Sequence, residues 1–283
     1  MDFAHKIIAY LDILGWKQLV KSVEDGTGPP LVELLSWLEC LGTGKERASL
    51  AQTGPKCCPV ARYHERHLDF QVTQVSDCVI VSAEISPSGV VNLLWHCWRA
   101  VFQLLEHGIL CRGYVKLGRI YHTERYVVGT GYQDAFEAER GVSAFRGEAD
   151  ERGTPFVQVD QAVTDFIDGC ADPCVKKMFT RMTKRDGDAV ALFPFQRLAR
   201  SFIVAGVGQR FDAQRERQSN ANLRKRIERY KHAVESHIDH SRPEVEQKAA
   251  HYLAALDAQI SACDETDRVI NEFDPAHTQR GPP

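Results

Sequence analysis

Asp12 and Asp77 are the strongest candidates in this sequence for catalytic residues, because of the segments that flank them. Asp12 ends an apolar run, HKIIAYLD, and a glycine-containing segment follows it directly. Asp77 lies between two apolar segments that only a tight turn can separate. Two carboxylates, completed by the phosphate oxygens of a substrate, form a ligand set that Mg²⁺ and Mn²⁺ prefer. Such a site polarises an attacking hydroxyl and neutralises a leaving pyrophosphate.

Strands and tight turns have to bring these two aspartates together. Residues 5–12 read as a buried strand, and helical spacing begins at residue 14, so that backbone amides at a helix start would face a phosphate. Residues 67–75 and 76–84 read as two strands of a hairpin with Asp77 at its tip. If the strands are neighbours, the carboxylates converge. Each aspartate alone would more often be a turn former or a helix cap, so the hypothesis depends on the pair.

The remaining pattern mixes strands and helices without strict alternation. Helices are predicted at 31–41, 90–108, 132–145 and 163–169, and strands at 109–122, 125–131, 154–160 and 188–195. This order predicts an α+β fold with an antiparallel or mixed sheet and helices on one side. Charged helical segments follow at 211–239 and 244–273, separated by Arg242-Pro243, and suggest a helical C-terminal appendage for packing or dimerisation. We therefore divide the chain into a catalytic domain (1–205), the appendage (206–273) and a frayed tail (274–283).

The composition excludes several classes of protein. Of the 283 residues, 43% are hydrophobic and 26% charged, which is typical of a globular protein. A net charge of -3 gives no general case for nucleic-acid or membrane binding. We expect no secretory signal and no transmembrane helix, because acids interrupt the N-terminal apolar run and no long apolar stretch exists. Nine scattered cysteines favour a reduced, cytoplasmic protein.

Four short motifs around the aspartates resemble the catalytic domain of class III adenylate/guanylate cyclases. They are an apolar strand with Asp-apolar-any-Gly-aromatic, a strand ending in Gly-Asp, an Arg-Gly strand and a glycine-rich helix entry. They occur in the family's order at Leu11–Trp16, Val75–Ile80, Arg112–Gly118 and Gly129–Ala135. The second motif has Ser76 in place of the glycine. The resemblance covers residues 5 to about 200.

The resemblance implies a ferredoxin-like palm core in a head-to-tail homodimer with active sites at the interface. It implies that Asp12, Asp77 and the Ile13 carbonyl hold two divalent metal ions, Mn²⁺ or Mg²⁺. The triphosphate would bind the backbone amides of Leu14, Gly15 and Trp16, together with Lys184. The 3′-hydroxyl of a nucleoside triphosphate then attacks the α-phosphate in line and expels pyrophosphate.

The base-facing positions depart from the purine cyclases. Thr73 stands where Lys or Glu reads the purine, and Tyr126 stands where the partner position has Asp or Cys. A Lys–Asp pair reads an amine and a ring nitrogen through charge-assisted hydrogen bonds, which Thr and Tyr cannot reproduce. Tyr126 would also fill space that a purine needs. A smaller base therefore suits this pocket, with Gln133 at the position of the ribose-orienting Asn.

The transition-state Arg of the family aligns with Glu137, which reverses the charge. Another cation must then serve, and the first substitute is Arg140, because three residues along a helix return to nearly the same face. Arg112, Arg119, Lys184 and Arg185 are also available, although Arg112 could equally form a structural ion pair.

These departures are similar to those of the bacterial anti-phage pyrimidine cyclases of the Pycsar type. That resemblance implies a cytoplasmic enzyme that makes cyclic UMP, or next cyclic CMP, as a defence signal. Three alternatives stay open: a purine cyclase with an atypical pocket, an inactive cyclase-like protein that binds nucleotide, and a diguanylate-cyclase-like palm domain. The last lacks a GG-acid-acid-Phe loop at the hairpin, where Val75-Ser76-Asp77-Cys78 stands instead.

Overall fold

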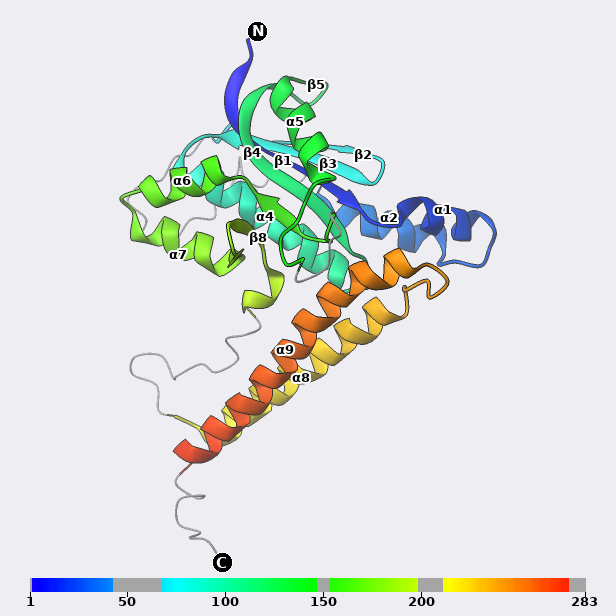
Figure 1. Ribbon diagram of the computed structural model, residues 1–283, viewed down its shortest axis with the longest axis vertical. Helices are drawn as coiled ribbons and strands as arrows, with labels where there is room; N and C mark the ends of the chain where they lie inside the picture. Colours follow the sequence, from blue (N-terminus) through cyan, green and yellow to red (C-terminus); the bar gives the residue numbers. More distant parts are fainter. Residues whose placement is uncertain (1, 43–67, 147–152, 198–210, 275–283) are drawn as a thin grey trace, which may run out of the picture. The chain divides into compact units, whose positions relative to one another are not determined.

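The computed structural model describes the chain except for residues 1, 43–67, 147–152, 198–210 and 275–283 (Figure 1). The chain divides into two compact units, Met1–Pro194 and Phe195–Pro283. The candidate tail, apart from residue 274, and the start of the candidate appendage lie outside the described residues.

The first unit contains one mixed sheet and the helices around it. Its strands are β1 (Ala4–Ile13), β2 (Gln71–Val75), β3 (Cys78–Glu84), β4 (Cys111–His122), β5 (Val127–Val128), β6 (Val157–Val159), β7 (Thr183–Asp186) and β8 (Ala189–Leu192). Its helices are α1 (Trp16–Glu24), α2 (Leu31–Cys40), α4 (Pro87–Leu105), α5 (Thr130–Glu139), α6 (Gln161–Gly169) and α7 (Pro173–Met182), and the short 3₁₀ helix η1 (Pro194–Arg197) follows.

The strand order of the sheet is β2-β3-β1-β4-β6-β8-β7, with β5 paired to β4. All pairs are antiparallel except β4 with β6, which are parallel. The α+β class with a mixed sheet agrees with the sequence-based prediction. β1 lies between β3 and β4, so the end of β1 is close to the β2–β3 hairpin and to the start of β4.

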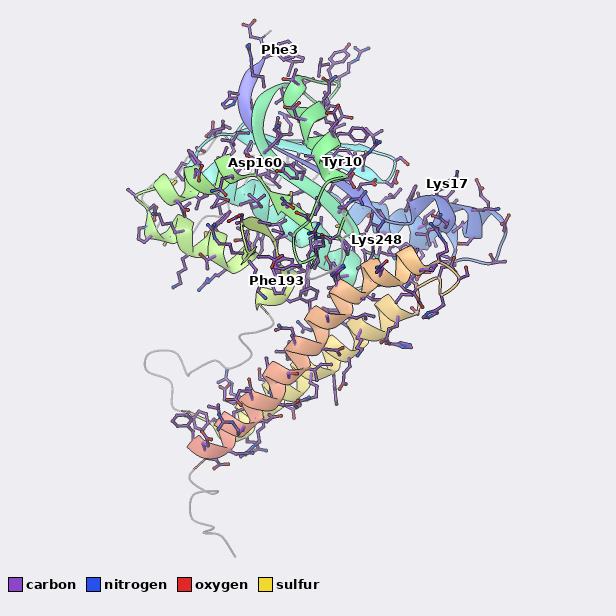
Figure 2. All side chains as sticks on the ribbon, viewed as in Figure 1. Phe3, Tyr10, Lys17, Asp160, Phe193 and Lys248 are labelled. Carbon is purple, nitrogen blue, oxygen red and sulfur yellow. The ribbon has the colours of Figure 1, made fainter. Side chains whose placement is uncertain are left out.

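Helices cover both faces of the sheet, so the prediction that they lie on one side was wrong. Alternate β1 residues Ile7, Ala9, Leu11 and Ile13 belong to the large core shared with α4. Ile8 and Tyr10 point to the other face, where they pack with Ala135 and Phe136 of α5. Tyr10 is labelled in Figure 2. Because both faces are covered, β1 is almost continuously apolar instead of alternating.

Helix α4 is the main helix of the large core, and it contains a buried histidine. Ser86 caps it by accepting a hydrogen bond from the Gly89 amide at 3.0 Å. His96 is 5% exposed and lies 3.0 Å, through Nε2, from the Leu41 carbonyl. Burial lowers the pKa of His96 to about 4, because a charged imidazole would lose its hydration.

This histidine should make the fold sensitive to acid. A depressed folded-state pKa means that stability is complete above pH 6.5 and is lost as the pH falls toward 4, by about 3 kcal/mol. His96→Gln keeps a donor for Leu41 but does not titrate. Urea unfolding at pH 7 and pH 4.5 should therefore show a smaller acid-induced loss in the variant, whereas equal losses would contradict the assignment.

Helix α7 and strand β7 were not predicted from the sequence. Helix α7 has an apolar face at Val175, Phe179 and Met182, a spacing that was available in the sequence. Strand β7 has the sequence TKRD with three exposed residues at the edge of the sheet. Its pairing with β8 depends on a tight turn at Gly187 and not on an apolar pattern.

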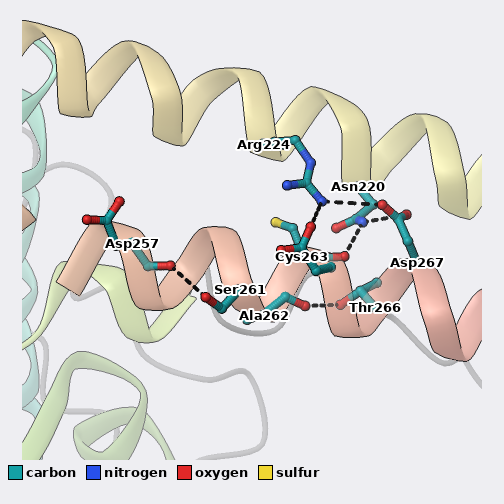
Figure 3. Close-up of polar contacts among 9 residues, drawn as sticks. Asn220, Arg224, Asp257, Ser261, Ala262, Cys263, Thr266 and Asp267 are labelled. Carbon is teal, nitrogen blue, oxygen red and sulfur yellow. Dashed lines mark hydrogen bonds and ion pairs between the residues drawn. The ribbon is translucent and has the colours of Figure 1, made fainter. Parts of the chain in front are cut away.

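The second unit is a helical hairpin of α8 (Ala213–Glu235) and α9 (Pro243–Phe273), and the two helices break at Arg242-Pro243 as predicted. Buried α9 residues follow a three-and-four spacing, which is typical of a coiled-coil seam. They are Ala249, Tyr252, Leu256, Gln259, Cys263, Thr266 and Ile270. Buried Asn220 of α8 donates to the Cys263 carbonyl at 2.8 Å and to Asp267 at 2.6 Å (Figure 3). Arg224 of α8 forms an ion pair with Asp264 of α9. These polar contacts fix the register of the hairpin.

Across the described ranges, no helix combines the length and the apolar character that a membrane span requires.

Candidate active site

Asp12 and Asp77 lie next to each other at one end of the sheet. Asp12 is the penultimate residue of β1 and is paired with Cys78 of β3 and Arg112 of β4. Asp77 lies in the two-residue turn between β2 and β3. The Ile13 amide donates to the Asp77 carbonyl at 3.1 Å, which ties the turn to the end of β1. The two strands therefore bring both carboxylates to one point.

The turn that carries Asp77 needs an unusual backbone. Ser76 has a φ of 54°, in the left-handed region that glycine adopts most easily. This conformation closes the hairpin in two residues and leaves Asp77 immediately before β3. The local strain at Ser76 is thus a condition for placing the second carboxylate beside the first.

The negative charges around Asp12 favour the binding of a cation. Burial, the charges of Asp77 and Glu139, and a hydrogen bond with the Asp77 side chain raise the pKa of Asp12 to about 7, while Arg112 acts in the opposite direction. The described residues contain no group of three or more His, Cys, Asp or Glu side chains suited to a metal ion. Two crowded carboxylates nonetheless fit a hard divalent ion whose other ligands come from substrate oxygens.

Arg112 is the cation nearest in register to Asp12, and it is held in place by protein groups. Its Nε forms an ion pair with Glu139 of α5, which is 3% exposed, and its Nη1 donates to the Gly153 carbonyl at 3.1 Å. Arg112 is therefore a structural ion-pair residue, one of the two roles that the sequence left open, and it links α5 to β4 beside Asp12.

The segment after Asp12 has the form of an anion site. Gly15 precedes α1 with a φ of 76°, no side chain caps the helix, and its first turn has no acidic residue. The uncapped amides at this helix start, Trp16 included, suit a phosphate. The Leu14 amide instead donates to the Leu110 carbonyl at 2.9 Å, so the expectation that Leu14 binds the triphosphate needs correction.

Helix α5 approaches β4 at a pair of glycines. A Cβ on Gly131 would lie 2.5 Å from Ile8 Cδ1 and 2.9 Å from the Gly118 backbone, and a Cβ on Gly118 would lie 2.6 Å from Gly131 Cα. These contacts are too close for any side chain. The glycines of the third and fourth motifs thus set the position of Glu139 at the other end of α5.

Gly131→Ala should destabilise the protein by about 1–3 kcal/mol, because the added methyl group has to displace α5 or Ile8. Gly169→Ala in α6 is the matched control, because a Cβ there would have no atom within 4 Å. Urea unfolding of both variants tests this, and equal midpoints would show that the close approach carries no cost.

The predicted base and ribose residues lie on three different segments: β2, the β4–β5 connection and α5. Thr73 of β2 is half-buried, and its Oγ1 lies 2.9 Å from Nε2 of His122. Tyr126 is 51% exposed and lies in the β4–β5 connection, directly before β5, with the Arg125 guanidinium over its ring. Gln133 is exposed on α5.

Among the described residues, neither Arg140 nor Lys184 forms an ion pair with Asp12 or Asp77. Arg140 and Glu137 are exposed, and the Arg140 guanidinium lies 5.0 Å from the centre of the Phe136 ring. Lys184 is on β7, with β4, β6 and β8 between it and β1. Its ammonium lies over the rings of Phe145 and Phe193.

His122, Ser82 and Glu139 were not predicted from the sequence as residues of the site. Glu139 follows Gly131 and Ala135 at four-residue intervals on the buried face of α5, and an acid on such a face signals a buried ion pair. No comparable signal marks His122, because its contacts with β2 and β3 depend on the path of β4.

No protein-family model matches the chain, and comparison with curated proteins gives no match.

Proposed function

We propose that this protein is a nucleotide cyclase that converts a pyrimidine nucleoside triphosphate into its 3′,5′-cyclic nucleotide and pyrophosphate. The observation that carries the proposal is the meeting of Asp12 and Asp77 beside the uncapped start of α1. A carboxylate pair and a phosphate-binding helix start at one point suit phosphoryl transfer, in which positioning and charge stabilisation supply most of the catalysis.

Each residue of this cluster has a role in the proposal. Asp12, Asp77 and the Ile13 carbonyl would hold two divalent ions, Mn²⁺ or Mg²⁺, whose charge would stabilise the attacking oxygen and the leaving pyrophosphate. Gly15 shapes the turn into α1, and the first-turn amides around Trp16 bind the triphosphate. The engaged Leu14 amide has a supporting role, because its bond to Leu110 anchors this turn.

The topology is compatible with the palm fold that we propose. Strands β1 to β4 with their connecting helices have the order β-α-β-β-α-β, and their spatial order β2-β3-β1-β4 is that of a ferredoxin-like sheet. Many functions use this sheet, so the function rests on the site and not on the fold.

Thr73 and Tyr126 would face the base and Gln133 the ribose, with UTP preferred to CTP. Neither side chain carries a charge, whereas the purine cyclases recognise the base with charged groups at these positions. This difference favours a pyrimidine. Half-buried Thr73 offers a hydroxyl, and exposed Tyr126 offers an aromatic surface.

We further propose a homodimer in which each active site draws on two chains. Lys184 is exposed and separated from β1 by three strands in one chain, and exposed Arg140 forms no ion pair with either aspartate in the described part of the chain, so a second copy would supply these cations. Mixing the inactive variants Asp12→Asn and Lys184→Ala should restore activity, because a heterodimer would retain one complete site. Absence of any restored activity would exclude a shared site.

Incubation of the purified protein with each of four labelled nucleoside triphosphates and Mn²⁺ tests the reaction. Cyclic UMP or cyclic CMP is the expected product. Turnover of ATP or GTP alone would instead identify a purine cyclase with an atypical pocket.

A second candidate, a nucleotide-binding protein without turnover, is favoured by exposed Glu137 at the position where the resemblance expects a cation. Binding of a nucleoside triphosphate with no product after prolonged incubation would support this candidate over the cyclase.

A further inference from the structure

His122 forms a hydrogen-bonded bridge between two hydroxyl groups on neighbouring strands. Its Nδ1 lies 2.9 Å from Ser82 Oγ on β3, and its Nε2 lies 2.9 Å from Thr73 Oγ1 on β2. Ser82 is completely buried and His122 is 5% exposed, whereas Thr73 at the end of the bridge is half-buried. The bridge therefore runs from the interior to a hydroxyl that a ligand can reach.

The buried end of the bridge determines where its protons lie. Among the described residues, Ser82 Oγ has no hydrogen-bond partner other than His122 Nδ1. A buried hydroxyl proton needs an acceptor, so Ser82 donates to Nδ1, which must then be unprotonated. A doubly protonated imidazole would leave the Ser82 proton without an acceptor. His122 consequently carries its proton on Nε2 and donates it to Thr73 Oγ1.

This arrangement fixes the direction of the Thr73 hydroxyl. Thr73 Oγ1 accepts from His122, and the part of the chain that the structure describes provides no acceptor for its own proton. The proton is thus available to a ligand, and Thr73 acts as a donor. Without the bridge, a threonine hydroxyl would rotate and either donate or accept.

We propose that His122 and Ser82 are positioning residues that select uracil over cytosine by holding Thr73 as a donor to O4 of the base. The inference rests on the proposed function. Uracil has a carbonyl oxygen at position 4, which accepts this bond, whereas cytosine has an amino group there, which would face a donor. A buried polar mismatch of this kind discriminates between substrates strongly.

The experiment measures kcat/KM for UTP and CTP with the wild type and with Ser82→Ala, Thr73→Val and Thr73→Ser. The wild type should prefer UTP by more than about tenfold. Ser82→Ala frees the imidazole to accept from Thr73, and Thr73→Val removes the donor, so both should reduce the preference by at least about tenfold, mainly through KM. Thr73→Ser retains the hydroxyl and should therefore retain the preference for UTP. The control Thr164→Val removes a buried hydroxyl of α6 and should leave the preference for UTP unchanged.

A second measurement observes the imidazole directly. ¹⁵N NMR of histidine-labelled protein, with the His122 signals assigned by their loss in His122→Gln, should show an unprotonated Nδ1 in the wild type. Ser82→Ala should shift these signals toward a mixture of tautomers.

Three results would overturn the inference. They are a protonated Nδ1 in the wild type, a wild type that favours CTP or neither pyrimidine, and an unchanged UTP preference in both folded variants. The proposed function fails separately, and takes this inference with it, if the wild type cyclises no pyrimidine triphosphate.

Discussion

Asp12→Asn is expected to lower the cyclase turnover by at least about 1,000-fold while the protein remains folded. The amide keeps the size of the side chain but removes the negative charge that a divalent ion needs at the end of β1. Asp77→Asn should have a similar effect, because the two carboxylates share one site. The measurement is product formation from labelled UTP with saturating Mn²⁺.

The matched control is Asp165→Asn, which removes an exposed carboxylate on α6. It should retain wild-type turnover. Mn²⁺ should raise the melting temperature of the wild type and the control but not of Asp12→Asn, because a ligand that binds only the folded state stabilises it. Full activity in both active-site variants would remove the basis of the proposed function.

The pKa of Asp12 adds a pH dependence to this prediction. In the metal-free protein this pKa is about 7, above its ordinary value, so the contribution of Asp12 to stability is complete below pH 4 and is lost as the pH rises through 7. Asp12→Asn should therefore melt at a higher temperature than the wild type at pH 8 in EDTA, and the gap should close toward pH 4. Binding of Mn²⁺ should strengthen over the same rise in pH, because the ion displaces the proton.

The local patterns of the sequence were sufficient to predict most strands of the first unit and both helices of the second. The run HKIIAYLD became β1, and the pair of apolar segments around Asp77 became the β2–β3 hairpin. These elements depend on neighbouring residues and on tight turns, which a sequence records directly. The edge strand β7 was missed because three of its four residues are exposed and carry no apolar signal.

The surroundings of the candidate site were harder to predict, because they depend on contacts between distant segments. Arg112 meets Glu139 only because Gly118 and Gly131 allow α5 to lie directly on β4. That approach also places α5 on the face of the sheet opposite α4, which no helical or strand pattern records. The bridge from Ser82 to Thr73 through His122 likewise joins three strands.

Glu139→Gln is expected to destabilise the protein by about 3–5 kcal/mol. The substitution leaves the half-buried Arg112 without its counter-charge, and the Gly153 carbonyl alone cannot replace a carboxylate. Asp134→Asn is the matched control on the same helix. It breaks the pair with Lys116, in which Asp134 is 52% exposed, and should cost less than about 1 kcal/mol. Urea unfolding measures both changes.

The same variant separates the structural role of this ion pair from its effect on the site. Glu139 raises the pKa of Asp12, so Glu139→Gln should lower that pKa and let Mn²⁺ bind at a lower pH than in the wild type. In a double variant, Arg112→Met with Glu139→Leu, both charges are replaced by apolar groups, which should recover much of the lost stability. Arg112 lowers the pKa of Asp12, and its removal offsets the loss of Glu139, so the pH at which Mn²⁺ binds should return toward the wild-type value. If Glu139→Gln unfolded at the wild-type urea concentration, the ion pair would not be what holds α5 beside Asp12.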